Sequence, residues 1–241
     1  MDNKTRHALK NDRFVTATKS GLEWAGENRR SVIVTVTLLL VIIVGAVGGY
    51  WLYNYRTGKA DLAFAAAMTA YDAPLQNSGQ PATPGVTTYA SSADRARAAN
   101  ALFVSVANQY SLTTPGRNAR YFAGLTYMDM GQTASAESTL KAVAGSWDRD
   151  LSALGKMALA AVYHQSGRDQ QAIDLYNQVA AKPSETVSFG MAKLALAALY
   201  DSTGHADAAK KIYAELKDKD AKGAAGQIAS EKLTDAVQVQ N

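Results

Sequence analysis

The apolar residues of this chain follow two patterns, one continuous and one periodic. Residues 31–53, SVIVTVTLLLVIIVGAVGGYWLY, contain no charged side chain. Because a helix rises about 1.5 Å per residue and the hydrocarbon core of a bilayer is ~30 Å thick, a run of this length predicts a transmembrane helix. Beyond it, apolar residues recur at helical spacing in segments separated by Gly or Pro, which predicts a series of amphipathic helices. The expected fold class is therefore all-α.

The residues that flank the apolar run indicate its orientation. Four Lys or Arg side chains lie within about 20 residues before it, and two, Arg56 and Lys59, within about 20 after it. Because positive charge favours the cytoplasmic side, this bias predicts a cytoplasmic N-terminus and a larger part outside. Residues 1–30 hold seven Lys/Arg against four Asp/Glu and are expected to form a basic cytoplasmic tail against anionic lipid. A cleaved signal peptide is the alternative, but such peptides have shorter apolar cores.

Residues 54–112 are expected to form a first helical pair. A helix is predicted over 58–73, with Leu62, Ala65, Ala66 and Thr69 as its apolar stripe, and Pro74 ends it. Residues 74–92 carry three of the five prolines and show no periodicity, which predicts a flexible loop. A second helix is predicted over about 92–110.

A set of four residues at fixed spacing then occurs three times between residues 113 and 220. It consists of a Tyr, a Gly four residues later, an Ala five residues after that, and a Leu or Tyr four residues further on. The Tyr of the second copy lies 36 residues after that of the first, and the Tyr of the third lies 37 residues after that of the second. A repeat with a period of this size predicts stacked helical hairpins. Each Gly follows a helical run, where a left-handed residue is needed, and each Ala is small because two antiparallel helices cross there. Residues 59–110 would be a degenerate fourth unit, and residues 221–241 a C-terminal capping helix and tail. The three sets are Tyr127, Gly131, Ala136 and Leu140; Tyr163, Gly167, Ala172 and Tyr176; and Tyr200, Gly204, Ala209 and Tyr213.

This pattern resembles the tetratricopeptide repeat, in which a further small residue precedes the Tyr. Gly124 holds that position in the first unit, Ala160 in the second and Ala197 in the third. The period exceeds the ~34 residues of the family, which implies longer loops between units. The expected architecture is one N-terminal transmembrane helix followed by a tetratricopeptide-like helical-hairpin solenoid.

The order of parts is similar to that of YfgM-type proteins. Residues 23–74 begin with EWAGENRR, continue through the apolar run and an aromatic cluster, and end in an Ala-rich helix before the repeats. The resemblance implies an ancillary subunit of the SecYEG translocon in the bacterial inner membrane, with its repeats in the periplasm. It also implies association with a PpiD-like chaperone and with exported polypeptides. The loop at 74–92 makes this chain longer than the shorter members.

The side chains needed for catalysis or metal binding do not form a recognisable set. The chain has no Cys and three His, and it lacks phosphate-loop, dinucleotide and nucleophile-elbow motifs. Asp148 and Asp150 flank Arg149 where a helix is expected to begin, which fits a favourable interaction with the helix dipole better than a catalytic pair. Residues 54–241 hold 18 Lys/Arg against 17 Asp/Glu, too little excess for a nucleic-acid surface. We expect no enzyme, no cofactor and no metal.

The face of each first helix opposite its hairpin partner is the candidate protein-binding groove. This stripe is apolar for a surface, and Met recurs in it, which suits varied polypeptide partners. The alternative is that the C-terminal helix, expected at about 222–237, covers the stripe as core. The stripe comprises Asn118, Tyr121, Leu125 and Met128; Leu154, Met157, Ala161 and His164; and Met191, Leu194, Ala198 and Asp201.

Three functions are consistent with these features. A translocon-associated adaptor follows from the resemblance, and a general envelope-assembly scaffold follows from the repeats alone. A signalling role would rest only on the basic tail.

Overall fold

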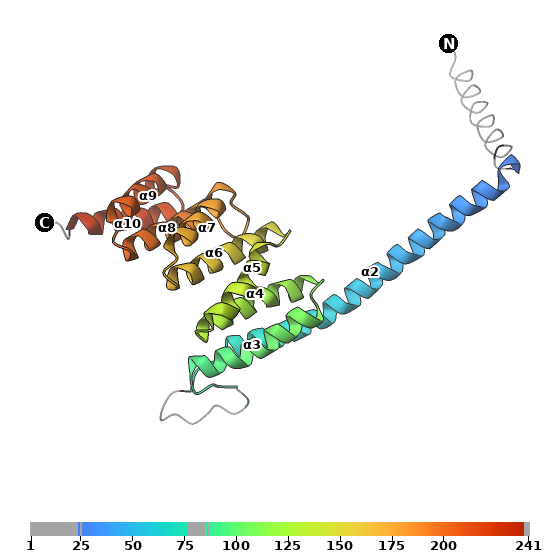
Figure 1. The fold of residues 1–241 in the computed structure, drawn as a ribbon, viewed down its shortest axis with the longest axis horizontal. Coiled ribbons are helices and arrows are strands. Elements are labelled where there is room, and N and C mark those ends of the chain that lie inside the picture. Colours follow the sequence, from blue (N-terminus) through green and yellow to red (C-terminus); the bar gives the residue numbers. More distant parts are fainter. Residues whose placement is uncertain (1–23, 25, 77–84, 86, 239–241) are drawn as a thin grey trace, which may run out of the picture. The chain divides into compact units, whose positions relative to one another are not determined.

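The computed structural model describes residues 24, 26–76, 85 and 87–238, and these contain nine helices and no extended strand. Residues 1–23 and 25 of the predicted tail, and residues 77–84 and 86 of the predicted loop at 74–92, lie outside this part. The all-α fold class is confirmed: a long apolar helix is followed by helical hairpins (Figure 1). The helices are α2 (Arg29–Tyr71), α3 (Ser92–Gln109), α4 (Thr114–Asp129), α5 (Thr133–Ala144), α6 (Arg149–Gln165), α7 (Asp169–Ala181), α8 (Phe189–Ser202), α9 (Ala206–Lys219) and α10 (Ala224–Gln238).

The chain divides into two compact units, Met1–Tyr55 and Arg56–Asn241. In the first, α2 presents its apolar side chains outward, and it is long and apolar enough to cross a membrane. The rings of Trp51 and Tyr55 stack at 5.9 Å between centroids at the end of the apolar run. Such aromatic pairs are typical of the lipid–water interface.

The sequence predicts separate helices over 31–53 and 58–73, whereas in the structure α2 continues from the first segment into the second. It is one helix of 43 residues. The segment after Tyr55 is rich in Ala and contains no Pro, so nothing in it breaks the helical backbone.

The predicted apolar stripe on this segment is wrong. Leu62 is 75% exposed, and the buried face instead contains Ala60, Ala67 and Ala70. Phe64 and Tyr71 lie on this face, and both contact Phe103 of α3 and Phe122 of α4, with ring centroids 5.7–6.0 Å apart. Aromatic rings bury more apolar area than Leu62 would, so they decide which side of the helix faces the core.

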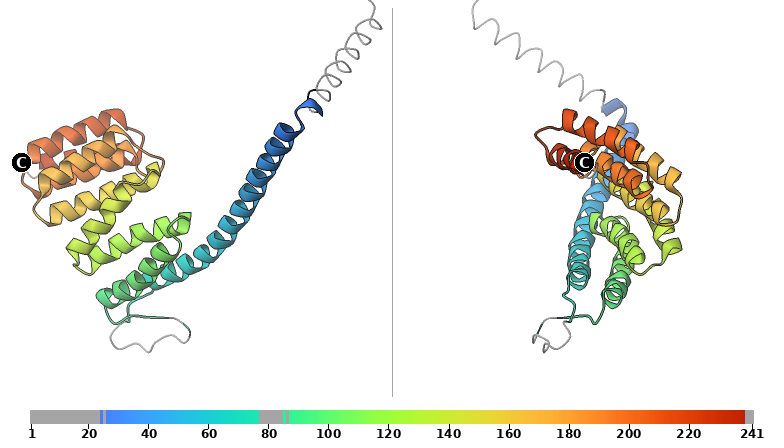
Figure 2. Two further views of the ribbon diagram at one scale, coloured as in Figure 1. Left: turned by 45° about the vertical axis from the view of Figure 1, so that its right-hand side comes forward. Right: turned by 90° about the vertical axis from the view of Figure 1, so that its left-hand side faces the viewer.

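In the second unit, consecutive helices from α3 to α10 pack against one another in chain order (Figure 2). Two pairs of helices that are not consecutive in the chain also touch, α4 with α6 and α8 with α10. A main core extends from Ala136 to Ala229, and a smaller one joins α2, α3 and α4.

The turn inside each of the three hairpins is formed by a left-handed glycine. The φ angles are 69° at Gly131, 70° at Gly167 and 79° at Gly204. No other residue type has a positive φ in the part of the chain that the structure describes. The predicted role of these glycines is confirmed.

The predicted small residues lie where the helices cross. Ala136, Ala172 and Ala209 are fully buried. A Cβ atom at Gly124 would lie 2.5 Å from Cδ2 of Leu140, so no side chain fits between α4 and α5 there. The spacing of the repeat is therefore set by packing.

The first helix of each hairpin begins at a polar cap. The side chains of Thr113, Asp148 and Ser188 accept hydrogen bonds from backbone amides of α4, α6 and α8. Asp148 caps α6 and Asp150 lies in its first turn, as expected from the sequence.

Candidate functional site

The predicted stripe lies on α4, α6 and α8, the first helices of the three hairpins. Its apolar members on α4 and α6 are half-buried and pack at the edges of the cores. On α8, Met191 is 51% exposed, and Ala198 and Asp201 are also exposed. The stripe is therefore partly accessible to solvent and partly supported by the core.

Helix α10 packs on α9 and α8 at the C-terminal end of the stack. Ala225 and Ala229 are buried in this contact, and a Cβ atom at Gly190 would lie 2.6 Å from Cβ of Ala225. The exposure of the stripe is measured with α10 in this position. The side chains of α4 and α6 named above keep their partial exposure in its presence.

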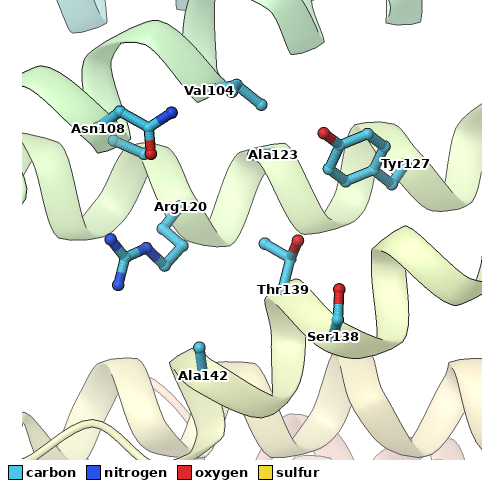
Figure 3. A pocket seen from close by; sticks show the side chains of 9 residues that line it. Val104, Asn108, Arg120, Ala123, Tyr127, Ser138, Thr139 and Ala142 are labelled. Carbon is cyan, nitrogen blue, oxygen red and sulfur yellow. The ribbon is translucent and has the colours of Figure 1, made fainter.

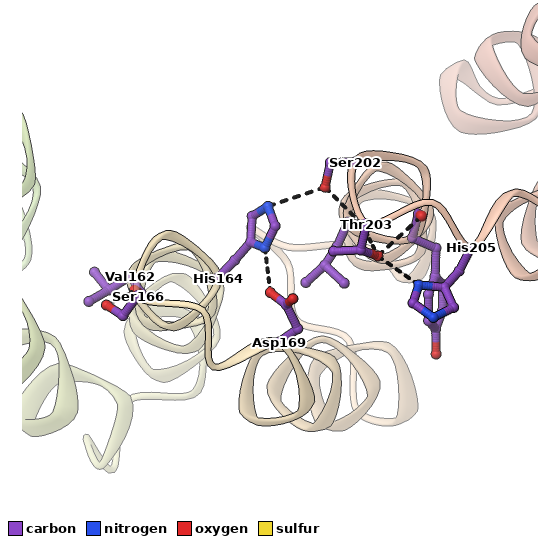
Figure 4. Close-up of polar contacts among 9 residues, drawn as sticks. Val162, His164, Ser166, Asp169, Ser202, Thr203 and His205 are labelled. Atoms are coloured by element: carbon purple, nitrogen blue, oxygen red, sulfur yellow. Dashed lines mark hydrogen bonds and ion pairs between the residues drawn. The ribbon is translucent and has the colours of Figure 1, made fainter.

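His164, one member of the stripe, joins two hairpins (Figure 4). Its Nδ1 lies 2.6 Å from Oδ1 of Asp169, and its Nε2 lies 3.2 Å from Oγ of Ser202 on α8. The Ser202 hydroxyl donates to the carbonyl oxygen of Leu199 at 2.8 Å. The His164–Ser202 contact joins residues 38 positions apart and could not be predicted from spacing. His164 and Asp169, in contrast, are only five residues apart and lie on either side of the Gly167 turn.

This arrangement has the residue order of a Ser–His–Asp triad but not its chemistry. In a triad the hydroxyl donates to the imidazole, whereas Ser202 donates to Leu199. Ser202 is also the last residue of α8, where backbone carbonyls rather than amides are free, so an oxyanion would not be stabilised. The contact is best described as a polar link between α6 and α8.

Asp201, another stripe member, accepts a hydrogen bond from the Tyr213 hydroxyl at 2.7 Å. Burial and this bond raise the pKa of Tyr213 to about 12. Asp201 therefore holds α8 to α9 within the third hairpin.

A second polar link joins the first and second hairpins. Arg168 donates two hydrogen bonds to the Glu137 carboxylate, at 3.1 and 2.6 Å, and Lys141 lies 2.6 Å from the same group. The Arg168 and Lys141 bonds lower the pKa of Glu137 to about 2. The Arg168 guanidinium also lies 4.4 Å from the centre of the Tyr163 ring.

A pocket of about 300 Å³ opens between α3, α4 and α5 (Figure 3). Figure 3 shows the Ser138 and Thr139 hydroxyls directed from α5 toward α4. No hydrogen bond or ion pair joins the Arg120 guanidinium to another residue of the described part of the chain. The lining residues are Val104, Ala107, Asn108, Arg120, Ala123, Tyr127, Ser138, Thr139 and Ala142.

The lining of this pocket carries one positive charge, on Arg120, and no acidic side chain. The pocket could not be predicted from the sequence because its residues come from three helices. Among the described residues no group of three or more His, Cys, Asp or Glu could hold a metal ion.

Stacked antiparallel hairpins with left-handed glycine turns and small crossing residues define a helical-repeat scaffold. The chain matches the family described as "Tetratricopeptide repeat-like domain" over residues 23–182. The match covers more than half of the 241 residues, so the chain belongs to this family. Its range begins before the apolar run and ends after the second hairpin. No curated protein and no solved structure matches the chain.

Proposed function

We propose that this chain is a membrane-anchored adaptor that binds other polypeptides at the outer face of the bacterial inner membrane. In its specific form, the proposal is an ancillary subunit of the SecYEG translocon that works with a PpiD-like chaperone on exported polypeptides. The observation that carries the general form is the partly exposed apolar stripe on α4, α6 and α8 in a repeat scaffold. The specific partners rest on the resemblance to YfgM-type proteins.

The chemistry of the stripe supports binding of varied chains. Met128, Met157 and Met191 recur along it, and the unbranched Met side chain adapts to differently shaped apolar groups. Met128 and Met157 pack on the cores, which hold in place the helices that present them, while Met191 is exposed. A rigid surface with adaptable side chains suits a client that differs from one encounter to the next.

The orientation of the anchor is part of the proposal. It rests on the excess of Lys and Arg before the apolar run and on the aromatic residues after it. With the N-terminus in the cytoplasm, the repeats lie on the side to which exported chains emerge.

Site-specific photocrosslinking in cells tests the partner assignment. A photoreactive amino acid is placed at Met157 in the stripe, or at Gln171, an exposed control position on α7. Crosslinks from position 157, but not 171, to translocon subunits or to the chaperone support the specific proposal. Crosslinks only to outer-membrane assembly machinery would contradict it and favour a general envelope scaffold.

A further inference from the structure

Two large apolar side chains are exposed to solvent at the open end of the first hairpin, α4 and α5. Leu112, in the connection between α3 and α4, is 81% exposed, and Trp147, between α5 and α6, is 82% exposed. Trp and Leu at this exposure leave apolar area in water, which is unfavourable unless another surface covers them.

Arg117 contacts the backbone of Leu112 and the ring of Trp147. Its Nη1 donates to the carbonyl oxygen of Leu112 at 3.2 Å, and its guanidinium carbon lies 5.0 Å from the centre of the Trp147 ring. Leu112, Arg117 and Trp147 therefore lie together at the open end of the first hairpin, and we call these three residues the rim.

The rim lies at the end of the second unit where the chain enters it. Arg56, the first residue of that unit, donates a hydrogen bond from Nη2 to the carbonyl oxygen of Gln109 at 3.1 Å. Gln109 ends α3, and Leu112 follows it by three residues. In the sequence, Arg56 directly follows the apolar run and its aromatic cluster.

Cationic side chains surround Trp147. A pocket of about 280 Å³ beside the indole is lined by Arg149, Lys156 and Lys182, and by no acidic side chain. The nearby acids are engaged: Asp148 accepts from the amides of α6, and Asp150 accepts from the amide of Thr186 at 3.0 Å.

We propose that this rim rests on the headgroup region of the membrane that the anchor crosses. Trp147 and Leu112 would enter the interface, where amphipathic aromatic and apolar side chains are favoured. Arg117, Arg149, Lys156 and Lys182 would lie beside lipid phosphate groups, which accept charge-assisted hydrogen bonds from Arg and Lys. This contact would orient the repeat unit at the membrane and limit the directions from which a client reaches the stripe. The inference rests on the proposed membrane anchoring.

Tryptophan fluorescence of the full-length protein in vesicles tests it, because the chain has three Trp, at 24, 51 and 147. In the Trp24→Phe, Trp51→Phe variant, Trp147 is the sole reporter. In vesicles of zwitterionic and anionic lipid, its emission is expected to shift to shorter wavelength and to be quenched by lipids brominated near the headgroup. Solvent-like, unquenched emission would overturn the proposal.

Two matched reporters separate the possible failures. The Trp24→Phe, Trp147→Phe variant reports on Trp51, and loss of quenching there would mean that the anchor has failed and the rim contact with it. A Trp-free background carrying Gln132→Trp reports from the exposed turn at the opposite end of the first hairpin. It is expected to stay unquenched. Equal quenching at 132 and 147 would indicate unoriented adsorption and would also overturn the proposal. Circular dichroism of each variant verifies that the helices are retained.

Discussion

The backbone amide of Gln132 donates a hydrogen bond to the carbonyl oxygen of Tyr127 at 2.8 Å, across the left-handed Gly131. The same bond, also 2.8 Å, joins Arg168 to Tyr163 and His205 to Tyr200. In each hairpin the bond closes the end of the first helix. The residue after Gly can also contact the Tyr ring: the Arg168 guanidinium lies over the ring of Tyr163, and the His205 ring meets that of Tyr200 edge to face. The Gly therefore follows the Tyr by four residues because, at this interval, the amide of the next residue can bond to the Tyr carbonyl and close the end of the helix.

The first prediction concerns this turn. Gly167→Ala places a Cβ atom on a residue with a φ of 70° and is expected to lower the free energy of unfolding by about 1–2 kcal/mol. Gly145→Ala is the matched control, because its φ is −85° and its Cβ would meet no atom closer than 3.6 Å. The control should change stability by less than about 0.5 kcal/mol in urea unfolding. Equal losses in both variants would contradict the role given to the left-handed glycine.

The second prediction concerns the crossing of α4 and α5. Gly124→Ala is expected to cost about 1–3 kcal/mol, because the new methyl group meets the fully buried Leu140. In a Leu140→Ala background the same substitution should cost markedly less, since the space is then free. A double-mutant cycle measures this coupling. Additive losses would show that Leu140 is not what excludes a side chain at 124.

The third prediction is a pH dependence. Because the folded-state pKa of Glu137 is depressed to about 2, its interaction with Arg168 stabilises the fold above the ordinary carboxyl pKa. That contribution should be lost as pH falls from about 4.5 toward 2. In Arg168→Met the Glu137 pKa should rise, and stability should fall less steeply over this range. Carboxyl titration by NMR measures the Glu137 pKa in both proteins, and an unchanged value in the variant would contradict the assignment.

The fourth prediction separates binding from folding in the stripe. Met191→Lys leaves the ammonium group in water because Met191 is 51% exposed, so the melting temperature should change little. Crosslinks to clients from position 157 should nevertheless decrease, since a charge interrupts the apolar stripe. Gln171→Lys on α7 adds the same charge away from the stripe and should leave both measurements unchanged. Undiminished crosslinking in Met191→Lys would show that clients bind elsewhere.

The sequence predicted features that depend on neighbours along the chain. The interval of the repeat predicted a turn at Gly131, and the small residues predicted where the two helices of a hairpin cross. The sequence did not predict which face of α2 is buried. That face contains Phe64 and Tyr71 because they pack against Phe122 and Phe103, which lie on other helices and contact them only in the folded chain. The His164–Ser202 link and the pocket around Arg120 were missed for the same reason: their partners belong to different helices.

The adaptor function requires the repeats to lie outside the cytoplasm, and protease accessibility tests this most directly. In spheroplasts, added protease should degrade the segment after the apolar run and leave a protected N-terminal fragment, while in intact cells the chain should survive. A reporter active only in the periplasm, fused after Asn241, should be active in the same strain. A repeat segment that is protected in spheroplasts, together with an inactive reporter, would contradict the account.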